Sequence, residues 1–263
     1  MQQKISYSSE IHGMDYKVLE SFKHDFNKIK NVEDFIPSRR KHNTGIGKTF
    51  EDLIGIVENN NLLVDYQDTL ELKSSRMLSS SMVTLFTKAP THPRGANTYL
   101  RENFGHPDPK QNNLKILHTT ISALKFNTYK NKYGFKLLVS EEDEKIFIII
   151  RDLMNDQLIY SNIYYSFNVL KDIVEKKCKH IAYIEAKTRK NNGTEEFKFT
   201  KATLLYGLTF EKFIVCINKG IIMYDIRIGV YKSGSNYGKT HDHGSGFRIP
   251  KAEIEKAFSM EQL

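Results

Sequence analysis

The chain contains 263 residues, of which 40% are hydrophobic and 11% aromatic, so it can bury the core of one large domain or of two lobes. Lys and Arg outnumber Asp and Glu by 39 to 31, and the resulting net charge of +8 favours a polyanionic partner. Cys178 and Cys216 are far apart and the longest apolar run covers only residues 146–150, which argues against a disulfide framework and a membrane span and predicts a cytoplasmic protein.

The first third of the chain begins with an amphipathic pattern. Apolar residues recur at helical spacing from Val18 to Ile29 and predict a helix. The basic run at 38–42 fits either phosphate contacts or a solvated linker. Residues 44–55 contain Gly-Lys-Thr but lack the upstream glycine and the leading strand of a phosphate-binding loop, so they predict a helix that ends near Gly55.

An acidic loop at 64–70 runs into a short strand that carries Glu71 and Lys73. Side chains alternate along a strand, so these two share one face, and Asp65 lies just upstream. Two converging carboxylates form an oxygen-rich pocket that suits Mg²⁺. A lysine beside them can orient an attacking water and favour its deprotonated form. An Asp followed by Glu-x-Lys is the pattern of the PD-(D/E)XK nucleases.

Two other carboxylates bear on this hypothesis. Glu51, on the helix predicted within 44–55, lies about 20 residues before Glu71 and fits either a supporting role at the metal pocket or a solvated helix surface. A second Glu-x-Lys at 185–187 has no Asp at a comparable upstream position, and we interpret it as structural.

The remainder of the chain alternates between strand and helix patterns. We expect strands within 79–86, 135–139, 145–151, 180–186 and 196–200, and helices within 167–174 and 210–217.

Residues 222–231 alternate cleanly between apolar and polar side chains. After a turn at 233–238, His241 and His243 share one face of a second run, and the two runs predict a β-ribbon of a width that the DNA major groove admits. The histidine pair also fits a metal site, although no third ligand is apparent. Arg248 can share the same groove only if the strand changes parity after His243.

Several blocks of sequence resemble the MvaI/BcnI group of restriction endonucleases, which is related to the mismatch-repair nickase MutH. The blocks cover residues 44–53, 84–90, 93–98, 225–231 and 239–249. The resemblance implies an α/β fold with a PD-(D/E)XK core, in which helices flank a mixed sheet and two lobes surround a DNA cleft. It places a catalytic lobe at about 1–125 and a DNA-recognition lobe at 126–263.

The resemblance also implies an activity. It indicates a monomeric type II restriction endonuclease that uses Mg²⁺ to cut double-stranded DNA, one strand per binding event. The site would be short and pseudo-palindromic with flanking G·C pairs, of the CCNGG kind. A cognate DNA methyltransferase is the implied functional partner. A MutH-like nicking repair enzyme and a catalytically silent DNA-binding protein stay open as alternatives.

Residue by residue, the resemblance implies that Asp65, Glu71 and the Leu72 carbonyl hold the metal, with Lys73 catalytic and Glu51 in support. The implied base-reading residues are Asp225, Arg227, Tyr231, His241, His243 and Arg248. The chain has one extra residue between Asp65 and Glu71, which makes Asp68 a competing ligand. Gly246 replaces a small side chain of the family pattern and is expected to loosen the turn before Arg248.

Overall fold

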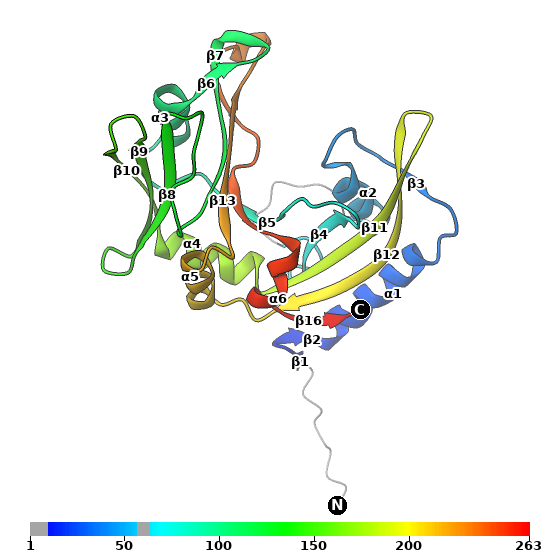
Figure 1. The fold of residues 1–263 in the computed structure, drawn as a ribbon. Helices are drawn as coiled ribbons and strands as arrows, with labels where there is room; N and C mark the ends of the chain where they lie inside the picture. Colours follow the sequence, from blue (N-terminus) through cyan, green and yellow to red (C-terminus); the bar gives the residue numbers. More distant parts are fainter. Residues whose placement is uncertain (1–9, 57–63) are drawn as a thin grey trace, which may run out of the picture. The chain divides into compact units, whose positions relative to one another are not determined.

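The computed structural model describes residues 10–56 and 64–263, which fold into two compact units (Figure 1). The first unit contains Met1–Ser81, Lys176–Leu208 and Phe258–Leu263, and the second contains Met82–Glu175 and Thr209–Ala257. This division differs from the single boundary near residue 125 that the sequence led us to expect. The chain returns to the first unit because a strand that begins at His180 pairs with the strand that begins at Glu71.

A mixed five-stranded sheet forms the centre of the first unit, in the order β16-β12-β11-β4 with β3 beside β12. The strands are β3 (Ile36–Pro37), β4 (Glu71–Arg76), β11 (His180–Asn191), β12 (Thr194–Tyr206) and β16 (Ser259–Gln262). β4 runs parallel to β11, and the other pairings are antiparallel. A small hairpin of β1 (Glu10–Ile11) and β2 (Met14–Asp15) precedes the first helix.

Two helices, α1 (Tyr16–Lys30) and α2 (Gly45–Leu53), pack against this sheet. The predicted apolar face of α1 is buried, and the Asp15 side chain caps the helix by accepting the backbone N–H of Lys17. The Phe50 ring lies between Phe26 and Phe199, which joins both helices to the sheet. Each such ring contributes about 1.5–3 kcal/mol through burial. The apolar face of the sheet is thereby covered, so its polar side chains project from the other face.

The second unit contains two antiparallel sheets. The larger has the order β5-β15-β13-β7-β6, with β14 also on β13, and the smaller has the order β10-β9-β8. The strands are β5 (Val83–Thr87), β6 (His106–Asp108), β7 (Gln111–Ile121), β8 (Tyr133–Ser140), β9 (Lys145–Asp152), β10 (Gln157–Ser166), β13 (Met223–Val230), β14 (Thr240–Asp242) and β15 (Gly246–Ile249). The helices are α3 (Ala96–Phe104), α4 (Phe167–Lys177), α5 (Phe210–Asn218) and α6 (Ile254–Ala257). The last two residues of α4 belong to the first unit.

Aromatic rings fill the core of the second unit. Tyr224 of β13 and Phe247 of β15 are 5.1 Å apart between ring centroids, and Tyr165 and Phe213 pack against Phe247. The Tyr224 hydroxyl donates to the Lys88 carbonyl at 2.9 Å, which satisfies its buried polar atom. With the even-numbered residues of β13 buried in this way, the odd-numbered residues occupy the opposite face of the sheet.

Most predicted elements are confirmed, with shifts at their ends. The strand expected within 79–86 begins at Val83. β11 continues five residues beyond its predicted end, to Asn191, where its side chains are exposed and lack the apolar alternation of a packed strand. β12 begins two residues before its predicted start and ends six residues after its predicted end, at Tyr206, and residues 202–205 of this extension are buried. Across the described ranges, no helix has the length and apolar character needed to cross a membrane. Both cysteines are buried thiols.

Candidate functional site

The start of β4 carries the predicted Glu71 and Lys73 pair. Their side chains lie on one face, where Lys73 Nζ is 2.6 Å from Glu71 Oε1. Leu70 and Leu72 are buried on the other face, in the core beneath α1 and α2. Glu71 is only 2% exposed, whereas the Lys73 side chain is partly exposed. The Glu71 carboxylate is therefore buried against the sheet, whereas the Lys73 ammonium is accessible to a ligand.

Asp65 is turned toward the same strand. Its Oδ2 accepts the backbone N–H of Leu72 at 2.8 Å, which links the acidic loop to the start of β4. Asp68 is exposed in the intervening turn, which is closed by the Tyr66 N–H donating to the Leu70 carbonyl at 2.9 Å. Asp68 has a φ of 53°, a left-handed conformation that is common for Asp in tight turns. The turn thus accommodates the extra residue, and Asp65 is the carboxylate that contacts β4.

The two oxygens of Glu71 have different surroundings. Oε1 accepts from Lys73, whereas Oε2 is buried and makes no hydrogen bond among the described residues. Oε2 forms an ion pair with Lys177, whose Nζ lies at 3.8 Å. A buried carboxylate oxygen without a donor costs free energy, and a hard divalent cation is a ligand that would satisfy it. The donor set of Asp65 and Glu71 therefore fits a metal ion that prefers oxygen.

Glu51 lies on α2, which packs against β4, and its side chain is partly exposed. Over residues 10–56 and 64–263, no three His, Cys, Asp or Glu side chains gather as a metal-binding group. The structure therefore does not bring Glu51 together with Asp65 and Glu71 as a third ligand.

The charges at this site are set by burial and by the neighbouring carboxylates. Burial lowers the pKa of Lys73, but the adjacent Glu71 carboxylate and Asp65 outweigh it, so the net effect is a raised pKa. Lys73 is therefore a cation at neutral pH. Burial also raises the pKa of Cys178 to about 12, so this thiol stays protonated and does not act as a nucleophile.

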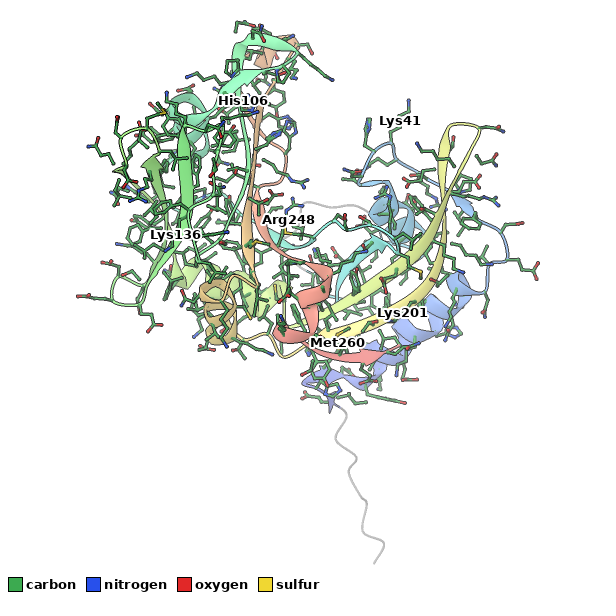
Figure 2. All side chains as sticks on the ribbon, in the orientation of Figure 1. Lys41, His106, Lys136, Lys201, Arg248 and Met260 are labelled. Atoms are coloured by element: carbon green, nitrogen blue, oxygen red, sulfur yellow. The ribbon has the colours of Figure 1, made fainter. Side chains whose placement is uncertain are left out.

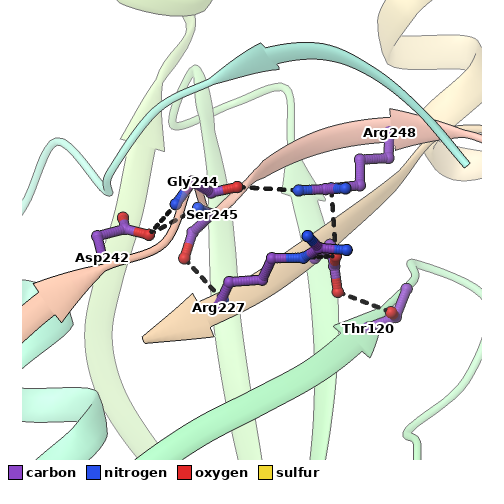
Figure 3. Close-up of polar contacts among 7 residues, drawn as sticks. Thr120, Arg227, Asp242, Gly244, Ser245 and Arg248 are labelled. Carbon is purple, nitrogen blue, oxygen red and sulfur yellow. Dashed lines mark hydrogen bonds and ion pairs between the residues drawn. The ribbon is translucent and has the colours of Figure 1, made fainter. Parts of the chain in front are cut away.

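A second polar cluster lies on the odd-numbered face of β13 (Figure 3). Asp225 is buried and accepts from Thr120 Oγ1 at 2.9 Å and from Arg227 Nε at 2.7 Å. Arg248 Nε lies 3.2 Å from the same carboxylate, and Arg248 also donates to the Gly244 carbonyl at 3.0 Å. Three predicted residues that are separated in the sequence thus form one network around a single carboxylate.

The turn between β14 and β15 positions this network. Asp242 Oδ1 accepts the backbone N–H groups of Gly244 and Ser245, and the Ser245 hydroxyl accepts the Arg227 backbone N–H at 2.8 Å. Pairing is interrupted after Asp242 and resumes at Gly246, which supplies the expected change of parity.

The expectation that Gly246 loosens this turn is wrong. A Cβ there would collide with the Phe86 carbonyl, so the glycine permits close pairing with β5.

The predicted histidines continue the same face. Tyr231 stacks on His241 with ring centroids 4.3 Å apart, and His241 and His243 are also 4.3 Å apart. His118 of β7 pairs directly with Arg227 across the strands, and its ring centroid is 6.2 Å from that of His243. A cleft of about 420 Å³ opens on this face, lined by His118, Thr119, Thr120, Asp225, Ile226, Arg227 and His243.

A model of the MvaI/BcnI restriction endonuclease family matches residues 24–258. The chain belongs to this family. A solved structure of a restriction endonuclease MvaI complex with cognate DNA substrate is similar, with a TM-score of 0.85 and 36% identity over 94% of this chain and 98% of that chain. MvaI in the absence of DNA gives a TM-score of 0.59 and 34% identity over 94% and 97%. A search of curated protein sequences found no match.

Membership of the MvaI/BcnI family confirms the predicted resemblance, the mixed α/β PD-(D/E)XK fold and the class of enzyme, a site-specific deoxyribonuclease. Restriction endonucleases of this kind use a divalent metal, which is consistent with the oxygen donors of Asp65 and Glu71.

Sequence reasoning missed several residues that lie beside Glu71 and Lys73 on the sheet. Parallel pairing places Tyr183 beside Lys73 and Glu185 beside Ser75, on the same sheet face. Glu185 Oε2 is 4.0 Å from Nζ of Lys201, which Figure 2 labels on β12. The Glu-x-Lys at 185–187 therefore begins on the face that carries Lys73. No local signal reveals a pairing between strands that are more than 100 residues apart.

His118 is likewise absent from the sequence prediction, because β7 has no pattern that links it to β13. Burial, followed by repulsion from Arg227, lowers the pKa of His118. Burial, followed by repulsion from the protonated forms of His241 and His118, lowers the pKa of His243. Both rings are therefore neutral at pH 7 and offer one hydrogen-bond donor and one acceptor each.

Proposed function

We propose that the chain is a monomeric type II restriction endonuclease that uses Mg²⁺ to hydrolyse double-stranded DNA at a short pseudo-palindromic site with flanking G·C pairs, of the CCNGG kind. One strand is cut per binding event. The observation that carries the proposal is the convergence of Asp65, Glu71 and Lys73 at the start of β4, with one oxygen of Glu71 buried and lacking a hydrogen bond.

Asp65, Glu71 and the Leu72 carbonyl would hold the metal. Asp68 is a weaker candidate because it is exposed in the turn. Glu51, on the helix that packs against β4, would support the site without being a metal ligand. When bound, Mg²⁺ supplies Lewis acidity toward the scissile phosphate and lowers the pKa of a bound water. The ion would also neutralise the buried Glu71 oxygen and so remove the free-energy cost of burying that charge.

Lys73 has two tasks in this proposal. Its ammonium, held by Glu71 Oε1, orients the attacking water by hydrogen bonding and favours the deprotonated form of that water. The same charge stabilises the negative charge that develops on the phosphate oxygens in the transition state. The raised pKa of Lys73 keeps it cationic for both tasks. The products would be a 5′-phosphate and a 3′-hydroxyl.

The polar cluster on β13 would read the bases. Arginine is suited to the O6 and N7 atoms of guanine, and a carboxylate is suited to the N4 amino group of cytosine. Arg227, Arg248 and Asp225 provide both functions within one network. Neutral His118 and His243, with His241 and Tyr231 beside them, offer further donors and acceptors. This combination favours G·C pairs in the recognition sequence.

Digestion of unmethylated plasmid DNA with Mg²⁺, followed by sequencing of the ends, tests the proposal. We expect discrete double-strand fragments with a common end sequence. Nicks that depend on hemimethylation would instead indicate a MutH-like repair enzyme, and DNA that is retarded in a gel but uncut would indicate a silent binding protein. Methylation by the cognate methyltransferase should protect the cleaved sites.

A further inference from the structure

A basic pocket lies at the end of β4 opposite to Glu71. It has a volume of about 710 Å³ and opens between the loop that precedes α2, where Figure 2 labels Lys41, and the tip of the β11–β12 hairpin. Its lining comprises Ser38, Arg39, Arg40, Lys41, His42, Asn43, Arg76, Lys190, Gly193, Thr194 and Glu195. All of these residues belong to the first unit.

Hydrogen bonds fix the walls of this pocket. Arg76 donates to both oxygens of Glu195 at 2.6 Å and to the Asn43 carbonyl at 3.3 Å, so one guanidinium joins β4, the hairpin and the loop. The Ser38 backbone N–H donates to the Glu195 carbonyl at 2.8 Å. Gly45 lies where a Cβ would collide with the Ser38 hydroxyl and the Arg40 carbonyl, so the loop passes closely over α2. These contacts fix the shape of the pocket in the folded chain.

The charge of the lining is one-sided. Five cationic side chains, those of Arg39, Arg40, Lys41, Arg76 and Lys190, face a single carboxylate, that of Glu195. The hydrogen bonds from Arg76 lower the pKa of Glu195, so that carboxylate is ionised and already paired. The lining contains no aromatic side chain other than His42 on which a base could stack. These features suit phosphate groups and do not suit a nucleobase.

We propose that this pocket binds backbone phosphates of the DNA outside the recognition sequence. The inference rests on the proposed function, because it takes DNA as the substrate. Arg76 follows Lys73 by three residues on one strand, a span of about 10 Å. Phosphates of one DNA strand recur about every 3.4 Å along the axis, so a duplex bound at Lys73 has further phosphates within reach of the pocket.

The test compares two double variants with the same loss of charge. Lys41→Ala with Lys190→Ala removes two exposed cations from the pocket, and neither side chain holds its walls. Lys17→Ala with Lys30→Ala removes two exposed cations from the ends of α1 and serves as the control. Binding to cognate and noncognate duplexes is measured across a salt series, with duplexes of about 30 base pairs and with duplexes trimmed to the recognition sequence.

On the longer duplexes the pocket variant should lose affinity equally for cognate and noncognate DNA. Its salt slope should fall by about one to two units, since each phosphate contact contributes about 0.9. On trimmed duplexes it should match the wild type. A pocket variant that behaves like the α1 control, or that loses as much affinity on trimmed duplexes, would overturn the inference. Failure of the proposed function would appear separately, as wild-type protein that neither cuts nor binds.

Discussion

In the proposed mechanism the two carboxylate oxygens of Glu71 have different roles, because their surroundings differ. Oε1 accepts from Lys73, whereas Oε2 makes no hydrogen bond, lies 3.8 Å from Lys177 Nζ and would be available to a metal ion. Asp65 completes the pair through its bond to the Leu72 N–H, whereas Asp68 is exposed in the turn. Two predictions follow from these environments.

Asp65→Ala or Glu71→Ala should abolish Mg²⁺-dependent cleavage while specific DNA binding is largely retained, because the polar cluster on β13 belongs to the other unit. Asp68→Ala should be mild. Cleavage rates and gel-shift affinities on the same duplex provide the measurement. An inactive Asp68→Ala together with an active Asp65→Ala would show that the ligand assignment is wrong.

Mg²⁺ should also stabilise the folded protein in the absence of DNA. A ligand that binds only the folded state at about 100 times its Kd adds about 2.7 kcal/mol to the free energy of unfolding. Thermal unfolding followed with and without Mg²⁺ should show a rise in Tm for the wild type and for Asp68→Ala. The same rise in Glu71→Ala would place the ion elsewhere.

At the scale of elements, the strands beside β13 complete the polar face that we propose reads the bases. β7 supplies Thr120 and His118, and β15 supplies Arg248, so the face is a product of three pairings rather than of an isolated ribbon. Arg227 and Arg248 differ in this setting. The Arg227 side chain is 44% exposed, whereas that of Arg248 is 9% exposed.

Arg227→Ala should therefore remove base discrimination with little effect on the fold. A charge-assisted pair to guanine contributes about 1–3 kcal/mol of discrimination, so cognate affinity should fall toward noncognate affinity. Arg248→Ala should show the same loss of discrimination and also a lower free energy of unfolding. Its guanidinium is buried beside Asp225, so removing it leaves that buried carboxylate with one fewer cation. Affinities for both DNAs and urea unfolding test this. Equal losses of affinity for both DNAs would show that this face binds DNA without reading its sequence.

Specificity should also depend on pH through His118 and His243. Their pKa values lie below the ordinary value of about 6.5, so both rings are neutral at pH 7 and gain protons only as the pH falls further. Protonation removes an acceptor from each ring and adds charge beside Arg227, so noncognate affinity should rise relative to cognate affinity. Because the unfolded chain binds these protons more readily, acid also lowers the stability of the fold.

The measurement is the ratio of cognate to noncognate affinity from pH 7.5 to about pH 5, compared with a His118→Gln and His243→Gln double variant, which should show a flatter profile. A wild-type ratio that is constant over this range would contradict the prediction.

At the scale of the whole molecule, one chain contains one set of Asp65, Glu71 and Lys73. If a monomer acts alone, the two strands of a site are cut in separate events. With limiting enzyme, supercoiled plasmid should pass through an open-circular form before it becomes linear, and agarose gels over time would display it. Linear DNA that forms with no nicked intermediate would point to two copies acting together.

Local patterns in the sequence were sufficient to predict many of the helices and strands and part of the candidate site. The apolar spacing of α1, the alternation along β13 and the shared face of Glu71 and Lys73 could all be predicted, because helix and strand geometry acts over a few residues. The change of parity before Arg248 was also predictable from the glycines between His243 and Phe247.

Tertiary structure decided the rest, since it depends on which strands pair over long separations. The parallel pairing of β4 with β11 brings Tyr183 and Glu185 to the sheet face that carries Lys73, and it returns the chain from the second unit to the first. The pairing of β7 with β13 adds His118 to the polar face of β13. A tight turn selects Asp65 over Asp68 as the contact to β4. Side-chain periodicity carries no information about strand partners, because the same alternation fits any neighbour.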